Sequence, residues 1–286
     1  MSAEAEVFNR NAKTFSFASR FFEKKTRSRI ETMYEFFRWA DDLAEKLDSE
    51  SRAELESTQK LWLKAKNDSR WARVQQLFDE IEVDEAILNV FFECMLNDQS
   101  SVRLKSDQDL MRYCFGAAAT VGLCLAKTFE VSDARAFLFA IDLGMAMQLT
   151  NIVRDIDEDY ENDKIYLPEL CEKPPSELTD QELRSLKLKY IEIADQFYES
   201  AQNGFRFLDF RARFCVGLAS KLYRQIGHYS LKSKFLRKRA YTNRFQKLFL
   251  LSLYVFEFFK ETLFPRSLKE HDKNLHKDLQ GLPYVL

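Results

Sequence analysis

The stretch that decides the fold reads GMAMQLTNIVRDIDEDYENDKIYLP and spans residues 144–168. Successive residues of an α-helix are about 100° apart, so the polar residues of this stretch fall within an arc of about 80°. These residues are Gln148, Asn151, Asp155 and Asp159. Apolar side chains occupy the rest of the cylinder, which predicts a helix that packs on several sides and points its acidic stripe into the protein. Asp157 falls on the opposite face, and we expect it to face solvent.

The acidic stripe has the composition of a metal site. A buried pair of carboxylates is costly without a cation. Asp155 and Asp159 lie one helical turn apart, and the amide oxygen of Asn151 lies one turn further back. Such oxygen ligands suit a hard cation such as Mg²⁺, which keeps several waters that a phosphate can replace. Alone, the pattern is equally typical of a solvated acidic helix end.

A second stretch, YEFFRWADDLAE at residues 34–45, repeats this geometry. Its polar residues Tyr34, Arg38, Asp41 and Glu45 share an arc of about 60°, with Asp42 beside them. Each acidic stripe has an arginine next to it, Arg38 in one and Arg154 in the other. Two such stripes indicate two facing helices around a shared cavity. The arginines could alternatively neutralise acids on a solvated surface, but the apolar residues on the other helix faces disfavour that interpretation.

Composition supports an all-α protein. The 286 residues, of which 46% are hydrophobic, can bury the core of one large domain, and we interpret residues 1–286 as a single domain although the length would allow two. Only 7 glycines and 5 prolines are present, and helix-length periodic segments recur throughout. The 43 basic and 45 acidic residues nearly balance, which gives no support for nucleic-acid binding.

Cysteine usage and the chain termini point to a cytoplasmic protein. The five cysteines, Cys94, Cys114, Cys124, Cys171 and Cys215, form no CxxC pair, and we expect reduced core residues. The N-terminal residues are charged and lack an apolar h-region, so no signal peptide is expected. No run of about 18 apolar residues predicts a transmembrane span. The histidines His228, His271 and His276 show no metal-ligand spacing, and we interpret them as structural or exposed.

Both acidic stretches resemble the Asp-rich motifs of the squalene and phytoene synthases. The family patterns are Y-x-F-x-R-x-x-D-D-x-x-D/E and G-x-A-x-Q-L-T-N-I-x-R-D-x-x-E-D followed by I-Y-L-P. Three more pieces agree in order, namely KTFSFASRFF (13–22), RYCFGAAATVG (112–122) and FRARFCVGLASKLYRQIG (210–227). The resemblance covers about residues 8–250, which leaves 251–286 as a C-terminal extension.

The resemblance implies an isoprenoid synthase-type helical bundle around a central cavity, and head-to-head condensation of two prenyl diphosphates. The leading interpretation is two geranylgeranyl diphosphates giving phytoene through prephytoene diphosphate, with a cyclopropyl intermediate. The nearest alternative is a squalene, dehydrosqualene or presqualene diphosphate synthase that uses farnesyl diphosphate, and only the squalene version would need NADPH. A non-catalytic assembly factor is a third alternative, which the presence of both carboxylate pairs disfavours.

The resemblance also assigns roles to residues. Mg²⁺, for which Mn²⁺ could substitute, would be held by Asp41, Asp42, Glu45, Asn151, Asp155 and Asp159. The catalytic residues would be Asp41, Glu45, Asp155 and Asp159, together with Tyr34 and Arg38. Substrate contacts are expected from Thr14, Phe15, Arg38, Tyr113, Gln148, Asn151, Arg154, Tyr223 and Arg239. Ala12 stands where the family often has a serine, so one phosphate hydrogen bond would be missing or would come from Thr14 or Ser16.

The remaining segments carry open alternatives. The small residues within 111–129 favour either tight helix packing or room for a polyprenyl chain, and residues 48–110 show only packing and surface. The apolar run 248–259 is either a core helix, which we favour, or a membrane contact. Because substrate and product are hydrocarbons, we expect peripheral association with the cytoplasmic membrane face through this run and the basic segment 232–244. The sequence leaves the oligomeric state open.

Overall fold

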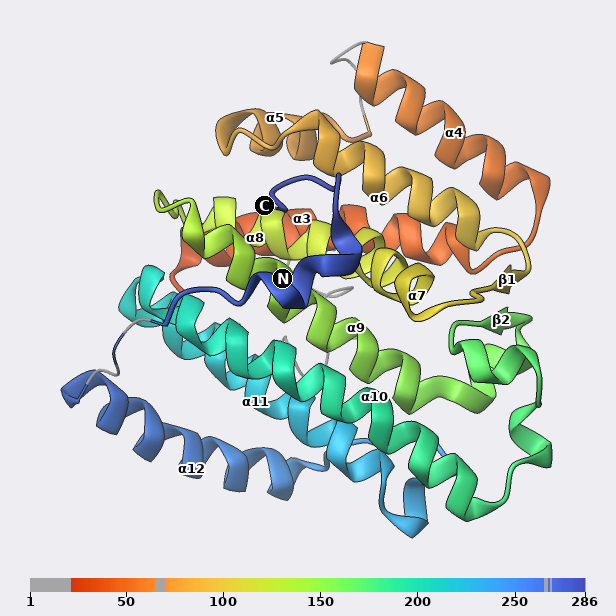
Figure 1. Cartoon of the computed structure of the whole chain (residues 1–286). Coiled ribbons are helices and arrows are strands. Elements are labelled where there is room, and N and C mark those ends of the chain that lie inside the picture. Colours follow the sequence, from red (N-terminus) through yellow and green to blue (C-terminus); the bar gives the residue numbers. More distant parts are fainter. Residues whose placement is uncertain (1–21, 65–69, 265–266, 268, 286) are drawn as a thin grey trace.

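The long helix α9 (Arg135–Glu161) contains most of the decisive stretch and runs through the middle of the assembly (Figure 1). The computed structural model describes residues 22–64, 70–264, 267 and 269–285. Helix α9 packs against α8, α10 and α11, and its buried residues come from several sides of the cylinder. The described chain is helical apart from two short strands, so the predicted all-α class is confirmed.

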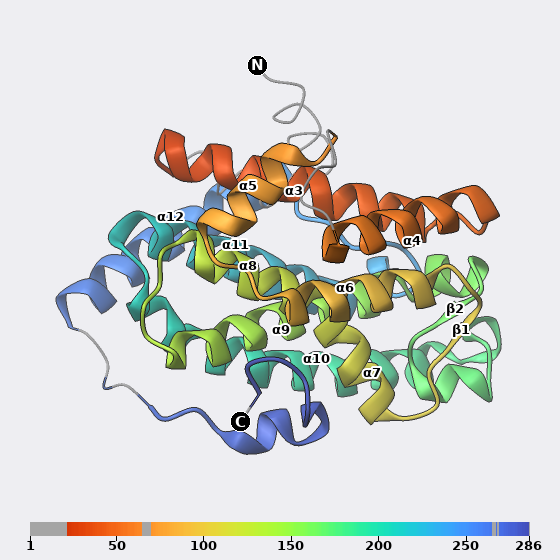
Figure 2. The ribbon, with the colours of Figure 1, turned by 90° about the horizontal axis from the view of Figure 1, so that it is seen from above.

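The other elements follow the predicted order along the chain. They are α3 (Lys24–Ala44), α4 (Ser49–Lys64), α5 (Ala72–Glu80), α6 (Glu85–Asp98), β1 (Val102–Arg103), α7 (Asp107–Cys114), α8 (Thr120–Thr128), β2 (Lys164–Ile165), α10 (Asp180–Ala201), α11 (Phe210–Ser230) and α12 (Arg244–Leu263). Helices α3 to α6 lie on one side of α9, and α10 and α11 lie on the other (Figures 1 and 2).

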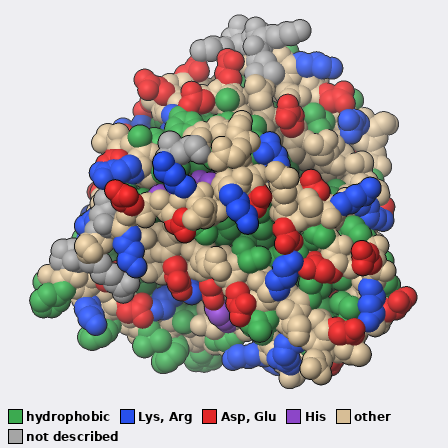
Figure 3. Space-filling model, in the orientation of Figure 1, with side chains coloured by type: hydrophobic (Ala, Val, Ile, Leu, Met, Phe, Trp, Pro, Cys, Tyr) green, Lys and Arg blue, Asp and Glu red, His purple; other side chains and the backbone are tan. Residues whose placement is uncertain are grey.

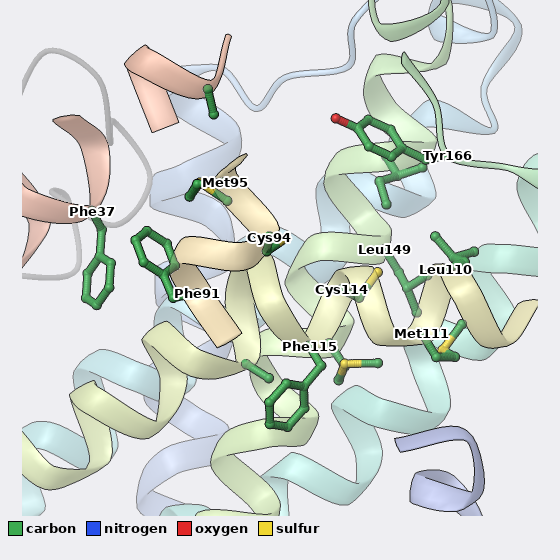
Figure 4. Close-up of a cluster of buried hydrophobic side chains, with 14 of the residues drawn as sticks. Phe37, Phe91, Cys94, Met95, Leu110, Met111, Cys114, Phe115, Leu149 and Tyr166 are labelled. Atoms are coloured by element: carbon green, nitrogen blue, oxygen red, sulfur yellow. The ribbon is translucent and has the colours of Figure 1, made fainter. Parts of the chain in front are cut away.

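An aromatic core holds α3 in place. Phe36 is fully buried and contacts a set of rings from α4, α5 and α6, which includes Trp62, Phe78, Phe91 and Phe92. Figure 4 shows how this core continues, with Phe37 of α3 facing Phe91 of α6 and the α7 residues on the far side. Burying one face of α3 in this way turns its polar stripe toward α9.

The run of small residues does both things that its sequence allowed. A short π-helical segment, Phe115–Ala119, joins α7 to α8. A Cβ atom added to Gly144 of α9 would lie 2.6 Å from the carbonyl oxygen of Ala118, so α9 passes this segment at backbone contact. Ala117, Ala118 and Gly122 also line an apolar cavity. Tight packing and space for a ligand are therefore provided by different sides of one helix.

A small parallel ladder ties the end of α6 to the end of α9. Strand β1 pairs with β2 in the register Val102 to Lys164 and Arg103 to Ile165. Because β1 follows α6 by a few residues and β2 follows α9, the ladder brings Asp98 at the end of α6 beside Lys164. Their charged atoms, Asp98 Oδ1 and Lys164 Nζ, are 3.9 Å apart.

Helix α12 corrects the sequence interpretation. We favoured a core position for residues 248–259, but only Leu250, Tyr254 and Phe258 of this run are buried, where they pack against α11. The other large apolar side chains of α12 are exposed. The helix lies at the outer edge of the molecule beside α11 (Figures 1 and 2).

Two helical segments, Asp107–Thr128 and Arg135–Glu161, are long and apolar enough to cross a membrane by length and composition. In their most apolar windows, 56% and 67% of the residues are buried inside the protein. Central helices of a globular core pass the same test, and α9 also carries the acidic stripe. We therefore assign both segments to the core.

The buried cysteines agree with prediction in four of five positions. All five are free; Cys94, Cys114, Cys124 and Cys215 are buried, whereas Cys171 is exposed. The prediction of a core position was wrong for Cys171, which follows the short 3₁₀ turn Pro168–Cys171 at the surface.

The C-terminal segment returns to α9 through two histidines. His276 Nε2 and His271 Nε2 lie 2.7 and 3.0 Å from the two carboxylate oxygens of Asp142, which is fully buried. An ionised carboxylate only accepts hydrogen bonds, so both nitrogens donate. Burial alone would raise the pKa of Asp142, but these hydrogen bonds hold it below its usual range. The ligand atoms lie within 4.8 Å of one another, yet each nitrogen faces its own oxygen at hydrogen-bond distance, so we interpret the cluster as a structural clamp.

We predict that Asp142→Ala lowers the free energy of unfolding by about 2–4 kcal/mol, because it leaves two buried imidazoles without an acceptor. Urea denaturation followed by circular dichroism measures the loss. Asp195→Ala is the matched control, since it removes the carboxylate partner of the partly exposed His228 and should cost no more than about 1 kcal/mol. Equal losses for both variants would contradict the clamp.

Candidate functional site

The two acidic stripes meet at one cavity of about 660 Å³. Helix α3 contributes Tyr34, Arg38 and Asp41, and Glu45 follows directly as its C-terminal cap. Helix α9 contributes the second stripe, whose lining residues are Gln148, Asn151, Arg154, Asp155 and Asp159. The facing arrangement that the periodicity predicted is therefore what the chain adopts.

On α3, one arginine holds the acids of the first stripe. Arg38 Nη1 donates to Asp41 Oδ2 at 2.5 Å, and Arg38 Nη2 contacts Asp42 and lies 3.6 Å from Glu45 Oε1. Asp42, which the resemblance counts among the metal ligands, does not line the cavity. Arg38 Nε is buried and has no hydrogen-bond partner, so one donor of the guanidinium is available to a bound anion.

On α9, the second stripe is paired in the same way. Arg154 holds Asp155 in a two-point contact, with Nε 2.9 Å from Oδ1. Arg239, from the loop before α12, lies 3.3 Å from the same Oδ1 and donates to Glu158 at 2.9 Å. The basic segment 232–244 thus sends one arginine into the cavity, which is where the resemblance placed Arg239.

Two of the cavity carboxyl groups have strongly raised pKa values. Burial, reinforced by Glu45 and Asp42 and only partly offset by Arg38, raises the pKa of Asp41 to about 7. Burial together with Asp155 and Glu158 raises the pKa of Asp159 to about 8. Although 48% of the Asp41 side chain is exposed, it faces the cavity and not open solvent. Both shifts show that the arginines leave negative charge at the site uncompensated.

The cavity has the chemistry of a divalent-cation site. Six carboxylates but only four cationic side chains line it, an excess of two negative charges. The carboxylates are Asp41, Glu45, Asp98, Asp155, Glu158 and Asp159; the cations are Arg38, Arg154, Lys164 and Arg239. The buried amide oxygen of Asn151 has no hydrogen-bond partner. An unpaired oxygen beside surplus carboxylates fits the oxygen ligands that Mg²⁺ takes.

Sequence reasoning missed an acidic network at one end of the cavity. Asp98 accepts hydrogen bonds from Tyr166 at 3.0 Å and from Tyr113 at 3.1 Å, and the two tyrosine rings stack at 4.5 Å. Burial raises the pKa of Asp98, which Lys164 and both hydroxyls oppose. Asp98 has no acidic partner at helical spacing in α6, so periodicity gave no signal. Our prediction that residues 48–110 carry only packing and surface was wrong here.

The polar cavity continues into a second, apolar cavity of about 260 Å³. The residues that line both are Ala117, Val121, Leu125, Met147, Gln148, Asn151 and Tyr223. Farther in, the wall consists of apolar side chains such as Phe129, Phe139 and Leu208. A ligand with a charged head and a hydrocarbon tail would match this change in polarity.

Aromatic side chains surround the junction of the two cavities. Tyr34, Phe37, Tyr113 and Tyr223 all line the polar cavity, and Tyr223 lines both. Burial raises the pKa of Tyr34 to about 12, so its hydroxyl stays neutral at neutral pH. The hydroxyl of Tyr113 is already engaged by Asp98, which leaves its ring as the group that faces a ligand.

Other predicted positions differ from expectation. Thr14 and Phe15 lie outside the described residues. Asp157, which we assigned to solvent, is half-buried; burial raises its pKa while the buried Lys187 of α10 opposes that shift. The assignment to solvent failed because the back of α9 packs on α10, so no face of α9 is fully exposed.

Sequence comparison connects this geometry with known enzymes. The family model described as squalene/phytoene synthase matches residues 8–246. A phytoene synthase of Pseudescherichia vulneris is 30% identical over 249 residues, which are 76% of this chain and 77% of the relative. A 15-cis-phytoene synthase of Enterobacter agglomerans is 30% identical over 264 residues, 84% of this chain and 90% of the relative.

Structure comparison agrees at the level of the fold. A dehydrosqualene synthase, solved as a crystal structure in complex with a ligand, superposes with a TM-score of 0.74 at 23% identity and covers 90% of this chain and 95% of that one. The match of the family model to most of the chain, together with relatives at 30% identity, decides the assignment. The chain belongs to the squalene/phytoene synthase family.

Proposed function

We propose that this protein condenses two molecules of geranylgeranyl diphosphate head to head and forms phytoene, with the loss of two diphosphates. The family is one of prenyltransferases. The observation that carries the proposal is the pair of acidic stripes at the mouth of a polar cavity that runs into an apolar one. The relatives named phytoene synthase favour the twenty-carbon substrate.

The charge balance of the cavity supports a role for Mg²⁺. Asp41 and Glu45 from α3, with Asn151, Asp155 and Asp159 from α9, are the residues that would hold it. Bound there, Mg²⁺ would neutralise the diphosphate and so make it a better leaving group. Arg38, Arg154 and Arg239 would add fixed positive charge, and the unpaired Nε of Arg38 can donate to a phosphate oxygen.

The rest of the cavity protects the cation that remains when diphosphate departs. The ring faces of Tyr34, Phe37 and Tyr223 can stabilise an allylic cation by cation–π attraction. The apolar wall beyond them holds the polyprenyl tail and keeps out water that would quench the cation. In this account the acids are metal ligands and the aromatic residues guide the carbocation.

A farnesyl-using synthase is the second candidate. The apolar cavity is modest in volume, and aromatic side chains such as Phe129, Phe139 and Phe205 close it. Cavity depth decides chain length in this account, so a short tail is the alternative that these rings favour. Because the product is a long hydrocarbon, we also propose that the enzyme works at the cytoplasmic face of a membrane.

The metal-ligand role of the acids is tested by kinetics. We predict that Asp41→Asn and Asp155→Asn lower kcat by roughly two to three orders of magnitude, since a lost ligand acts on the barrier itself. Glu161→Gln, an exposed acid at the end of the same α9 that does not line the cavity, is the control and should keep wild-type kcat. Wild-type turnover by either asparagine variant in Mg²⁺ would remove the metal-site interpretation.

A separate prediction concerns stability against pH. The pKa of Asp159 is raised to about 8 in the folded protein, so the folded state binds a proton that the unfolded state releases above about pH 4. Stability contributed by this group therefore falls as pH rises from about 4 to 8. We predict that Asp159→Asn raises the Tm at pH 8, by roughly 2 °C or more per kcal/mol of relief, while it abolishes turnover.

Thermal melts at pH 5 and pH 8 check this prediction. The gain of Asp159→Asn over the wild type should be larger at pH 8, where the wild-type carboxyl group must ionise or hold its proton at a cost. A Tm that falls in the variant at both pH values would mean that Asp159 stabilises the fold, which contradicts an uncompensated carboxylate.

Substrate choice is tested by incubating the purified enzyme and Mg²⁺ with farnesyl or geranylgeranyl diphosphate, with and without NADPH, and identifying the products. We predict phytoene, no need for NADPH, and a higher kcat/KM for the twenty-carbon substrate. Val121→Phe, at the junction of the two cavities, should reduce kcat/KM for that substrate at least tenfold more than for farnesyl diphosphate. Conversion of farnesyl diphosphate alone would establish the second candidate.

A further inference from the structure

Helix α12 turns an apolar face away from the protein. Seven large apolar side chains of this helix are between 43% and 83% exposed. They are Phe245, Leu248, Phe249, Leu253, Phe256, Phe259 and Leu263. At about 100° per residue they fall within an arc of about 140°. Figure 3 shows the result as a run of hydrophobic side chains along the lower left edge of the molecule, over α12. We call these seven residues the outer face of α12.

This pattern is the reverse of an ordinary surface helix, whose outer side is polar. Within the arc of the outer face, the only polar residues are Ser252 and Lys260. Glu257 lies outside that arc and pairs with Lys221 of α11. An exposed apolar patch of this extent marks an interaction site. Phe210 of α11, 53% exposed, packs against Phe258 and extends the patch past the end of α12.

We propose that the outer face of α12 docks on the surface of an anionic phospholipid bilayer. The interface region of a bilayer accepts Phe and Leu side chains from a helix that lies in its plane, and anionic headgroups attract nearby lysine and arginine. The outer face supplies the first and carries no acidic residue. Exposed basic residues supply the second, with Arg244 at the start of the helix, Lys260 near its end, and Lys234 and Lys238 just before it.

The structure also narrows the basic segment to part of its sequence. Arg237 is bound to Asp180 and to the carbonyl oxygens of Pro175 and Leu178, and Arg239 pairs at the cavity. These two arginines hold the loop to the protein and are not needed for lipid. The lysines of the segment, all exposed, are the ones that remain for headgroups.

A second copy of the chain fits this face less well than a bilayer does. Stable protein interfaces use roughly 20–30 residues on each side. The outer face of α12 with its neighbours Phe210, Tyr241 and Phe264 amounts to ten exposed apolar side chains. They also follow a single straight helix at the edge of the molecule, a shape that suits a flat surface of lipid (Figure 2).

The docked helix would sit against the wall of the hydrocarbon cavity. The apolar cavity is lined by Leu208 and Val216, and Phe214 packs against the same cluster. The ring of Phe214 lies 5.1 Å from Phe258 and 5.4 Å from Tyr254, two of the residues that α12 buries. Apolar packing is therefore continuous from the cavity to α12. Resting on the proposed function, this places lipid on the side where a hydrocarbon product must leave.

The test is co-sedimentation of the full chain with vesicles of phosphatidylcholine alone or with about one third phosphatidylglycerol, at low and high salt. We expect the wild type to bind the anionic vesicles and to bind less at high salt. Phe249→Ser combined with Phe256→Ser should lower the partition coefficient about tenfold or more. Leu61→Ser combined with Leu188→Ser, which removes comparably exposed side chains from α4 and α10, is the matched control and should bind like the wild type.

Two further measurements separate the outcomes. Prenyltransferase activity on detergent-dispersed substrate reports the proposed function independently, and it should be unchanged in both double variants. Sedimentation velocity reports the oligomeric state. Vesicle binding that is absent in the wild type, or equal in the wild type and the Phe249/Phe256 variant, overturns the docking surface. A wild-type dimer that the Phe249/Phe256 variant dissociates also overturns it, in favour of a second copy on this face.

Discussion

The structure depends on a concentration of negative charge that the protein cannot neutralise by itself. Six carboxylates from α3, α6 and α9 line one cavity against four cationic side chains. The consequence is visible at Asp41 and Asp159, whose pKa values are raised to about 7 and about 8. Such an arrangement costs stability and persists only where a bound cation or a charged ligand gives something back.

The rest of the fold holds these charges in position. Phe36 and the rings around it fix α3 on one side, and backbone contact near Gly144 fixes α9 beside α8. The β1–β2 ladder secures the ends of α6 and α9, and the clamp on Asp142 attaches the C-terminal segment to the other half of α9. Arg38 and Arg154 hold one acid each at short distance, which keeps the carboxylates together until a ligand arrives.

Local periodicity predicted what local periodicity can encode. The two acidic stripes, and their position on facing helices, followed from i, i+4 spacing with apolar residues on the other faces. Asp98 did not follow, because a two-residue ladder between segments far apart in the sequence brings it to the site. The clamp joins residues 129 and 134 positions apart, a distance over which no pattern carries information. The apolar composition of α12 was evident, but which of its sides is buried depends on how it meets α11.

The central claim is that the two stripes act together as one cation and diphosphate site. The most direct measurement is a crystal structure of the protein with Mn²⁺ and a non-reactive thiolodiphosphate substrate analogue, with anomalous diffraction at the manganese edge. The account predicts manganese between the carboxylates of α3 and those of α9, with the diphosphate bound beside it and Arg38 in contact with a phosphate oxygen. Diphosphate held by the arginines with no manganese peak, or manganese bound at one stripe alone and away from the diphosphate, would contradict it.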